Sequence, residues 1–225
     1  MYKLLTFSYL LLPLLVLFYK TKRKETVPII IAGYGVFAFT YLFFDAEYVP
    51  QDFRAAYALS YTTIEYLCFA AFFFLNTESK TIRKLIAILS AAFVAFQILF
   101  YFNVKDNQFR LDTIPIGVET ILLFIYIFIF FYDTLRSTKQ VDIYNNFGFW
   151  IAVGILLYLG VSFFFYILAN DMLIDEIDQY WVVTFIAEMI KNIMFCIAII
   201  MYLPKKKNFP NERLHQSQDS IPHLI

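Results

Sequence analysis

The stretch FWIAVGILLYLGVSFFFYIL, residues 149–168, runs for 20 consecutive positions without a charged side chain. An α-helix rises 1.5 Å per residue, so this stretch would be about 30 Å long as a helix. That length matches the hydrocarbon core of a bilayer, and an apolar run of this kind is typical of a transmembrane helix. The segment therefore predicts a membrane protein.

The rest of the chain repeats this pattern. Seven apolar runs, separated by short polar connections, cover residues 2–19, 27–44, 55–75, 82–102, 113–132, 147–169 and 180–202. The chain of 225 residues is 61% hydrophobic and 16% charged, which excludes a soluble enzyme, a nucleic-acid-binding domain and a disordered chain. We predict an all-α polytopic membrane protein, with a seven-helix transmembrane domain at 1–204 and a short polar tail at 205–225.

Lysine and arginine are unevenly distributed between the two sides of these spans. One set of alternate connections, with the tail, carries thirteen of them, the other side carries four, and Lys191 within a span completes the 18. Because cytoplasmic loops are rich in these residues, we predict a cytoplasmic tail and an outside N-terminus in the inner (plasma) membrane. The basic residues at 20–24 follow the first run and no small-residue cleavage site does, so we interpret that run as a span.

The inventory of reactive side chains argues against catalysis. Both histidines, His215 and His223, lie in the tail, so no span offers a histidine ligand for haem, di-iron or zinc. Cys68 and Cys196 lie within spans, where buried free thiols are the ordinary state. The chain has no glycine-rich phosphate loop and no nucleophile elbow. We therefore expect no enzyme activity, no cofactor and no metal site.

Four ionisable residues within the spans need an explanation: Glu65, Glu119, Glu188 and Lys191. Each costs roughly 2.5–3.5 kcal/mol to insert into a bilayer, so intramembrane charges mark candidate functional sites. Helical rise places Glu65 and Lys191 roughly 15 Å from the outer border of their spans, and the other two acids about 9–12 Å.

Uncharged polar residues share this outer half, among them Gln97 and Ser162, whereas the inner half is mostly aliphatic and aromatic. We predict an outward-facing polar pocket whose ligand-binding residues are Glu65, Glu119, Glu188, Lys191, Gln97 and Ser162. The connection at 169–180 holds four acids and no base, and such a rim favours cations near the mouth. Two alternatives stay open: a buried ion pair that only fixes helix order, and an oligomer interface.

A lysine in the seventh span with an acid in the third resembles the arrangement of microbial rhodopsins, in which the lysine carries retinal. The chain lacks that family's third-helix arginine, and Trp150 and Trp181 sit at helix ends and not within a retinal pocket. Seven helices also resemble sugar and amino-acid facilitators of the PQ-loop type, but the single Pro-Gln pair, at 50–51, lies in a connection.

The overall sequence pattern of the chain most resembles that of uncharacterised seven-helix membrane proteins of Bacteroidota. The stretches that carry this resemblance are YTTIEYL (61–67), VETILLFIYIF (118–128), residues 149–168 and IAEMIKNIMFCIAI (186–199). The shape is also similar to the membrane sensor regions of some histidine kinases, and this similarity implies a sensory role.

We therefore predict a membrane protein with a sensory or accessory signalling role. Its expected partners are the lipid bilayer, a small ligand from the outer side and a membrane or cytoplasmic signalling protein, with no nucleic acid. Two other functions remain open: a small proton- or cation-coupled transporter, and a helix-packing subunit of a membrane complex.

Overall fold

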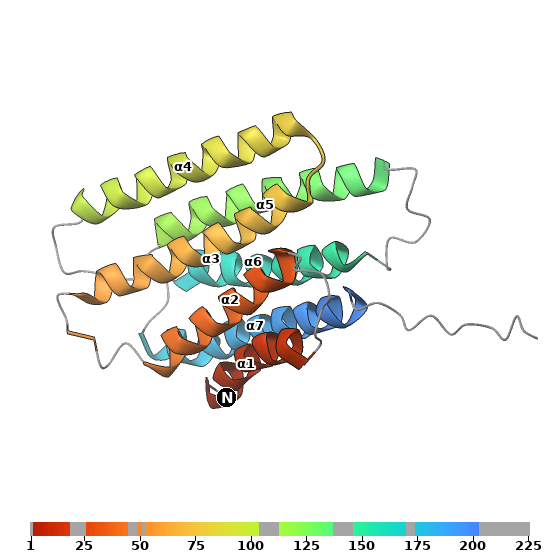
Figure 1. Cartoon of the computed structure of the whole chain (residues 1–225). Helices are drawn as coiled ribbons and strands as arrows, with labels where there is room; N and C mark the ends of the chain where they lie inside the picture. The colour runs from red at the N-terminus through yellow and green to blue at the C-terminus, as the bar shows by residue number, and fades with distance from the viewer. Residues whose placement is uncertain are drawn as a thin grey trace, which may run out of the picture.

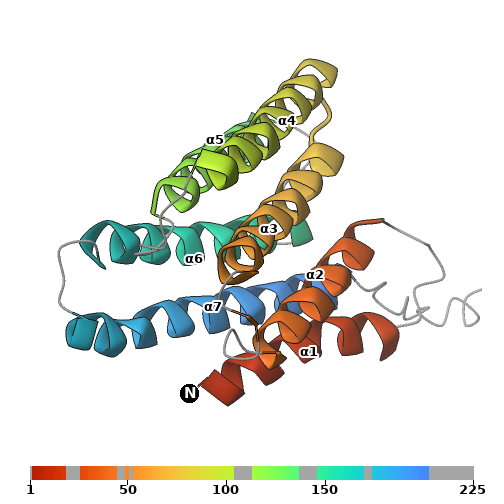
Figure 2. The same ribbon diagram turned by 90° about the vertical axis from the view of Figure 1, so that its left-hand side faces the viewer.

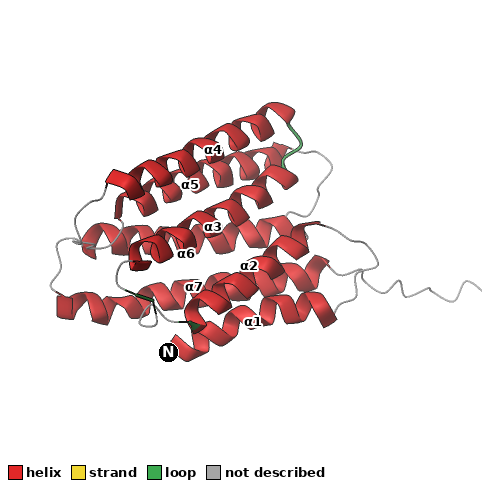
Figure 3. Ribbon diagram, turned by 60° about the vertical axis from the view of Figure 1, so that its left-hand side comes forward, coloured by secondary structure: helices red, strands yellow, loops and turns green. Residues whose placement is uncertain are grey.

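The computed structural model describes residues 2–18, 26–44, 49–50, 53–103, 113–136, 146–169 and 174–202. The seven helices are α1 (Tyr2–Phe18), α2 (Thr26–Phe43), α3 (Arg54–Asn76), α4 (Lys80–Asn103), α5 (Thr113–Arg136), α6 (Phe147–Ala169) and α7 (Ile174–Tyr202). The all-helical fold class is thus confirmed, and no strand occurs within the described ranges (Figure 3). The predicted tail at 205–225 lies outside them.

Helix ends differ from the prediction where polar residues extend an apolar run. The seventh helix begins at Ile174, six residues before the predicted border, because the acids of 174–179 lower the hydropathy without interrupting the helix. Similarly, α5 continues to Arg136, past the predicted border at 132.

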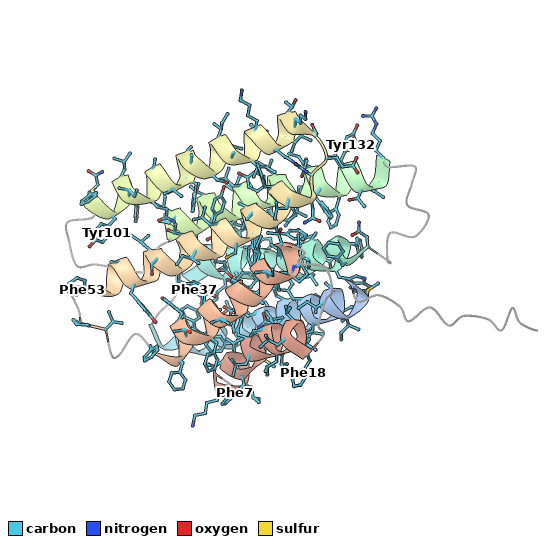
Figure 4. All side chains as sticks on the ribbon, in the orientation of Figure 1. Phe7, Phe18, Phe37, Phe53, Tyr101 and Tyr132 are labelled. Atoms are coloured by element: carbon cyan, nitrogen blue, oxygen red, sulfur yellow. The ribbon has the colours of Figure 1, made fainter. Side chains whose placement is uncertain are left out.

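Six of the helices, α2 to α7, are long and apolar enough to cross a membrane, whereas α1 is a shorter apolar helix. Large apolar side chains also cover much of the outer surface. Phe7 and Phe18, for example, are 61% and 81% exposed and project away from the bundle (Figure 4). A water-soluble protein rarely exposes so much contiguous apolar surface, so the chain has the character of a multi-pass membrane protein.

The helices form a closed bundle. Helix α1 packs on α2 and α7, α2 on α3, α3 on α5, α5 on α6 and α6 on α7, so these elements close into a ring. Helix α4 packs on α3 and α5 at the edge (Figures 1 and 2). Phe53 and Tyr101 mark one end of the bundle and Tyr132 the other, and these are called the Tyr101 end and the Tyr132 end (Figure 4).

Two glycines allow close contact between neighbouring helices. A Cβ atom at Gly35 of α2 would lie 2.8 Å from the Tyr9 carbonyl oxygen of α1. A Cβ atom at Gly154 of α6 would lie 2.9 Å from the Met194 Cβ atom and 3.3 Å from the Lys191 carbonyl oxygen. Gly160, by contrast, has open space beside it. Gly154 therefore brings α6 against the part of α7 that carries Lys191.

Candidate functional site

Lys191 is the most deeply buried charge in the described part of the chain. It lies in the middle of α7 and is 0% exposed. Its ammonium forms an ion pair with Glu65 of α3, with 3.1 Å between Nζ and Oε1. It also donates a hydrogen bond of 2.6 Å to the hydroxyl oxygen of Tyr34 on α2. A buried charge without such partners would be strongly destabilising, so these contacts are what allow Lys191 to lie there.

Glu65 accepts hydrogen bonds from both sides of the pair. The Tyr34 hydroxyl donates to Oε1 at 2.6 Å, and the Tyr158 hydroxyl of α6 donates to Oε2 at 3.2 Å. Each carboxylate oxygen therefore has a donor, and the side chain is 4% exposed. Charge-assisted hydrogen bonds of this kind are about twice as strong as neutral ones. The structure thus places α2, α3, α6 and α7 around one pair of opposite charges.

Aromatic rings enclose the ammonium. The Lys191 Nζ atom lies 3.7 Å from the centre of the Tyr158 ring, 5.1 Å from that of Tyr34, and 5.6 Å from those of Tyr9 and Phe69. The negative face of an aromatic ring attracts a cation within about 6 Å, and the attraction grows when water is excluded. The rings thus replace part of the hydration that the ammonium loses.

Glu188 joins this cluster through a tyrosine of α1. It lies three residues before Lys191 on α7 and is half-buried. The Tyr9 hydroxyl donates to Glu188 Oε2 at 2.8 Å, and Lys191 Nζ lies 3.5 Å from the same hydroxyl. We call the six residues Tyr9, Tyr34, Glu65, Tyr158, Glu188 and Lys191 the ion-pair network. Since Tyr9 belongs to α1, the network connects α1, α2, α3, α6 and α7.

The other three predicted site residues lie apart from these contacts. Gln97 of α4, Glu119 of α5 and Ser162 of α6 are each 4% exposed. The two polar atoms of the Gln97 amide, Glu119 Oε1 and Ser162 Oγ have no hydrogen-bond partner. The predicted residues thus form a fully bonded network and a separate unpartnered set.

No protein family, curated protein or solved structure matches the chain. The resemblance to seven-helix proteins of Bacteroidota therefore remains a prediction. The pairing of a seventh-helix lysine with a third-helix acid does agree with the arrangement expected from the rhodopsin resemblance. In this chain, however, Tyr34 and Tyr158 occupy the space directly around the lysine nitrogen.

Sequence reasoning missed the tyrosines that bind the charges. Tyr9, Tyr34 and Tyr158 lie mid-helix, not at the interfacial positions that tyrosine prefers. A second group was also missed: the Tyr66 hydroxyl bonds to those of Tyr126, at 2.9 Å, and Ser90, at 3.2 Å. A tyrosine in the middle of an apolar span must find a partner for its hydroxyl, and that depth was the available signal.

An apolar pocket lies beside the network, toward the Tyr132 end. Side chains of α2, α3, α6 and α7 line it, including Tyr34, Cys68, Ile151 and Phe195. Cys68 and Cys196 are free and half-buried. Within the described residues no group of three or more histidine, cysteine, aspartate or glutamate side chains could hold a metal ion. The chemistry of the site is therefore that of one ion pair, its tyrosines and the unpartnered set.

Proposed function

We propose that the chain is a seven-span protein of the inner membrane, with its N-terminus outside, its tail in the cytoplasm and a sensory or accessory signalling role. The six long apolar helices support membrane insertion. The thirteen-to-four distribution of lysine and arginine supports the orientation. Helix α1, with 17 residues, is about 26 Å long and needs only slight bilayer thinning to span.

The observation that carries the sensory role is the burial of Lys191 and Glu65 among side chains of α1, α2, α6 and α7. A buried pair of charges favours two discrete states, paired or separately neutralised, because a small separation leaves both charges without partners. The pair joins α3 to α7 across the bundle. A signal that weakens it would therefore let α7 shift against α3, and this movement would reach the cytoplasmic tail and a partner protein.

The two native thiols allow this movement to be tested. Cys68 follows Glu65 by three residues on α3, and Cys196 follows Lys191 by five on α7. In lipid nanodiscs, Glu65→Gln should raise the rate at which N-ethylmaleimide labels these thiols several-fold while the protein stays helical and monodisperse. Glu78→Gln is the matched control, since Glu78 is an exposed acid at the end of α3. Folded Glu65→Gln protein that labels at the wild-type rate would disprove the switch.

A cation-coupled transporter is the second candidate function. The unpartnered polar atoms of Gln97, Glu119 and Ser162 favour it, because transported ions bind to groups of this kind within a bundle. Transport predicts flux in proteoliposomes that depends on pH and is lost in Glu65→Gln. Sensing predicts saturable ligand binding without flux, so the two functions give opposite results in the same vesicles.

A further inference from the structure

Three buried side chains with unpartnered polar atoms come from α4, α5 and α6. They are Gln97, Glu119 and Ser162, each 4% exposed. Other buried hydroxyls in the bundle bond to their own helix: Thr120, 0% exposed, donates to the Ile116 carbonyl at 2.8 Å. Ser162 Oγ has no such bond. Buried polar atoms are nearly always hydrogen-bonded, so three unpartnered groups together indicate a bound species.

The three residues lie at the same depth. Gln97 is six residues from the end of α4, Glu119 six residues from the start of α5 and Ser162 seven residues from the end of α6. At 1.5 Å per residue, each lies about 9–11 Å from its helix terminus. These termini are all at the Tyr101 end of the bundle (Figure 1). The groups therefore occupy one layer.

They also face the same neighbour. Gln97 lies one turn from Phe93, whose ring is 4.2 Å from that of Tyr66 on α3. Glu119 lies two turns from Tyr126, which bonds to the Tyr66 hydroxyl. Residues one or two turns apart share a helix face, so Gln97 and Glu119 both face the outer half of α3.

Ser162 reaches the same region from the other side. It lies one turn beyond Tyr158 on α6, and the Tyr158 hydroxyl bonds to Glu65 of α3. Helix α5 packs directly on α3, α4 and α6, so it lies next to all the elements that carry or border the set. Gln97 and Glu119 thus face α3 from α4 and α5, and Ser162 lies on α6, which packs on α5.

The chemistry of these groups selects the bound species. A carboxylate, an amide carbonyl and a hydroxyl offer hard oxygen ligands, the type that alkali and alkaline-earth ions prefer. The set contains one carboxylate, which balances one positive charge, and Lys191 is already paired with Glu65. We propose that Gln97, Glu119 and Ser162 bind a monovalent cation, sodium, in the outer half of the bundle between α3, α4, α5 and α6.

The sequence from the end of α6 into the first turns of α7 is acidic. Residues 169–180 contain four acids and no base. A run of residues of one charge sign raises the local concentration of the opposite ion. The inference rests on the proposed function and deepens it, since it names the signal that reaches the ion-pair network: Ser162 lies one turn from Tyr158, whose hydroxyl bonds to Glu65.

The test compares sodium with a large organic cation. Full-length protein in nanodiscs is unfolded by heat in sodium chloride or in N-methyl-D-glucamine chloride at equal ionic strength. We expect a saturable rise of the unfolding temperature with sodium only, a loss of this rise in Glu119→Gln, and a half-saturating concentration raised about tenfold in Ser162→Ala. Ser60→Ala, an exposed serine of α3, is the matched control and should respond as wild type.

Three results would overturn the site. The first is equal unfolding temperatures in both salts, and the second is a wild-type sodium response in folded Ser162→Ala. The third is the same rise of the unfolding temperature produced by acidification without sodium, which would mean that Glu119 is protonated and binds no cation. Thiol labelling separates this failure from that of the proposed function. Sodium that stabilises the protein without changing the labelling of Cys68 and Cys196 leaves the site standing and removes the signalling role. Labelling that responds to Glu65→Gln in a protein whose unfolding temperature does not respond to sodium removes the site and leaves the proposed switch standing.

Discussion

Removal of either Lys191 or Glu65 should destabilise the protein. Removal of both charges should cost less stability than the sum of the two single losses. Lys191→Met leaves Glu65 with two tyrosine donors but no counter-charge, and Glu65→Gln leaves the ammonium with Tyr34 and the face of the Tyr158 ring. Breaking a buried pair costs about 3–5 kcal/mol. We place Glu65→Gln at the lower end, because its amide oxygen still accepts a hydrogen bond from Lys191.

The coupling between the two residues follows from the 3.1 Å separation of Nζ and Oε1. Residues in direct contact within one polar network couple by about 0.5–3 kcal/mol, and this pair, with both charges buried, belongs at the upper end. The double variant should therefore be more stable than the sum of the single losses predicts, by about 2–3 kcal/mol.

The assay is reversible unfolding in mixed micelles, followed by helical circular dichroism as the fraction of dodecyl sulfate increases. The wild type, both single variants and the double variant are measured under one condition. Lys84→Met is the control, since Lys84 is an exposed lysine of α4, and it should change stability by no more than about 0.5 kcal/mol. If the loss of unfolding free energy in the double variant equals the sum of the losses in the two single variants within about 0.5 kcal/mol, the ion pair is not a stabilising unit.

Two further comparisons follow from the packing and the hydrogen bonds. Gly154→Ala should destabilise the protein by about 1–3 kcal/mol, because the new Cβ atom would lie 2.9 Å from the Met194 Cβ atom. Gly160→Ala has open space around the new Cβ atom and should be neutral or stabilising. Equal effects of the two substitutions in the same unfolding assay would contradict the close α6–α7 contact. Tyr34→Phe removes two bonds of 2.6 Å and should cost about 1.5–3 kcal/mol. This is more than the cost of Tyr158→Phe, which removes the longer bond of 3.2 Å to Glu65 and keeps the ring beside the ammonium. The reverse order would show that the hydroxyl of Tyr158, and not that of Tyr34, holds the pair.

The fold was largely predictable from the sequence because the bilayer imposes a simple length requirement. Runs such as 149–168 satisfy it without reference to any other part of the chain. The start of α7 at Ile174 was not predicted, because hydropathy does not register polar turns that continue a helix beyond the apolar region. The existence of each helix thus follows from its local apolar run, whereas the length of a helix does not.

The site was predictable only in part. The cost of burying charge identified Lys191 and three acids, but the sequence left open which acid pairs with the lysine; in the structure it is Glu65. Depth did not indicate that Gln97 and Ser162 would stay outside the network, because depth says nothing about which helices are neighbours. Tyr34 was missed because its role depends on the packing of α2 between α1 and α3, which no local pattern reveals.

The most direct test of the account is the distance between α3 and α7 in lipid. Spin labels at Leu75 and Ile200, both exposed and near the Tyr132 end, would report it by pulsed dipolar spectroscopy in a Cys68→Ala/Cys196→Ala background. We predict one main distance population with the ion pair intact and a second, separate population when Glu65→Gln is added. An unchanged single population in folded Glu65→Gln protein would contradict the claim that this pair controls the position of α7.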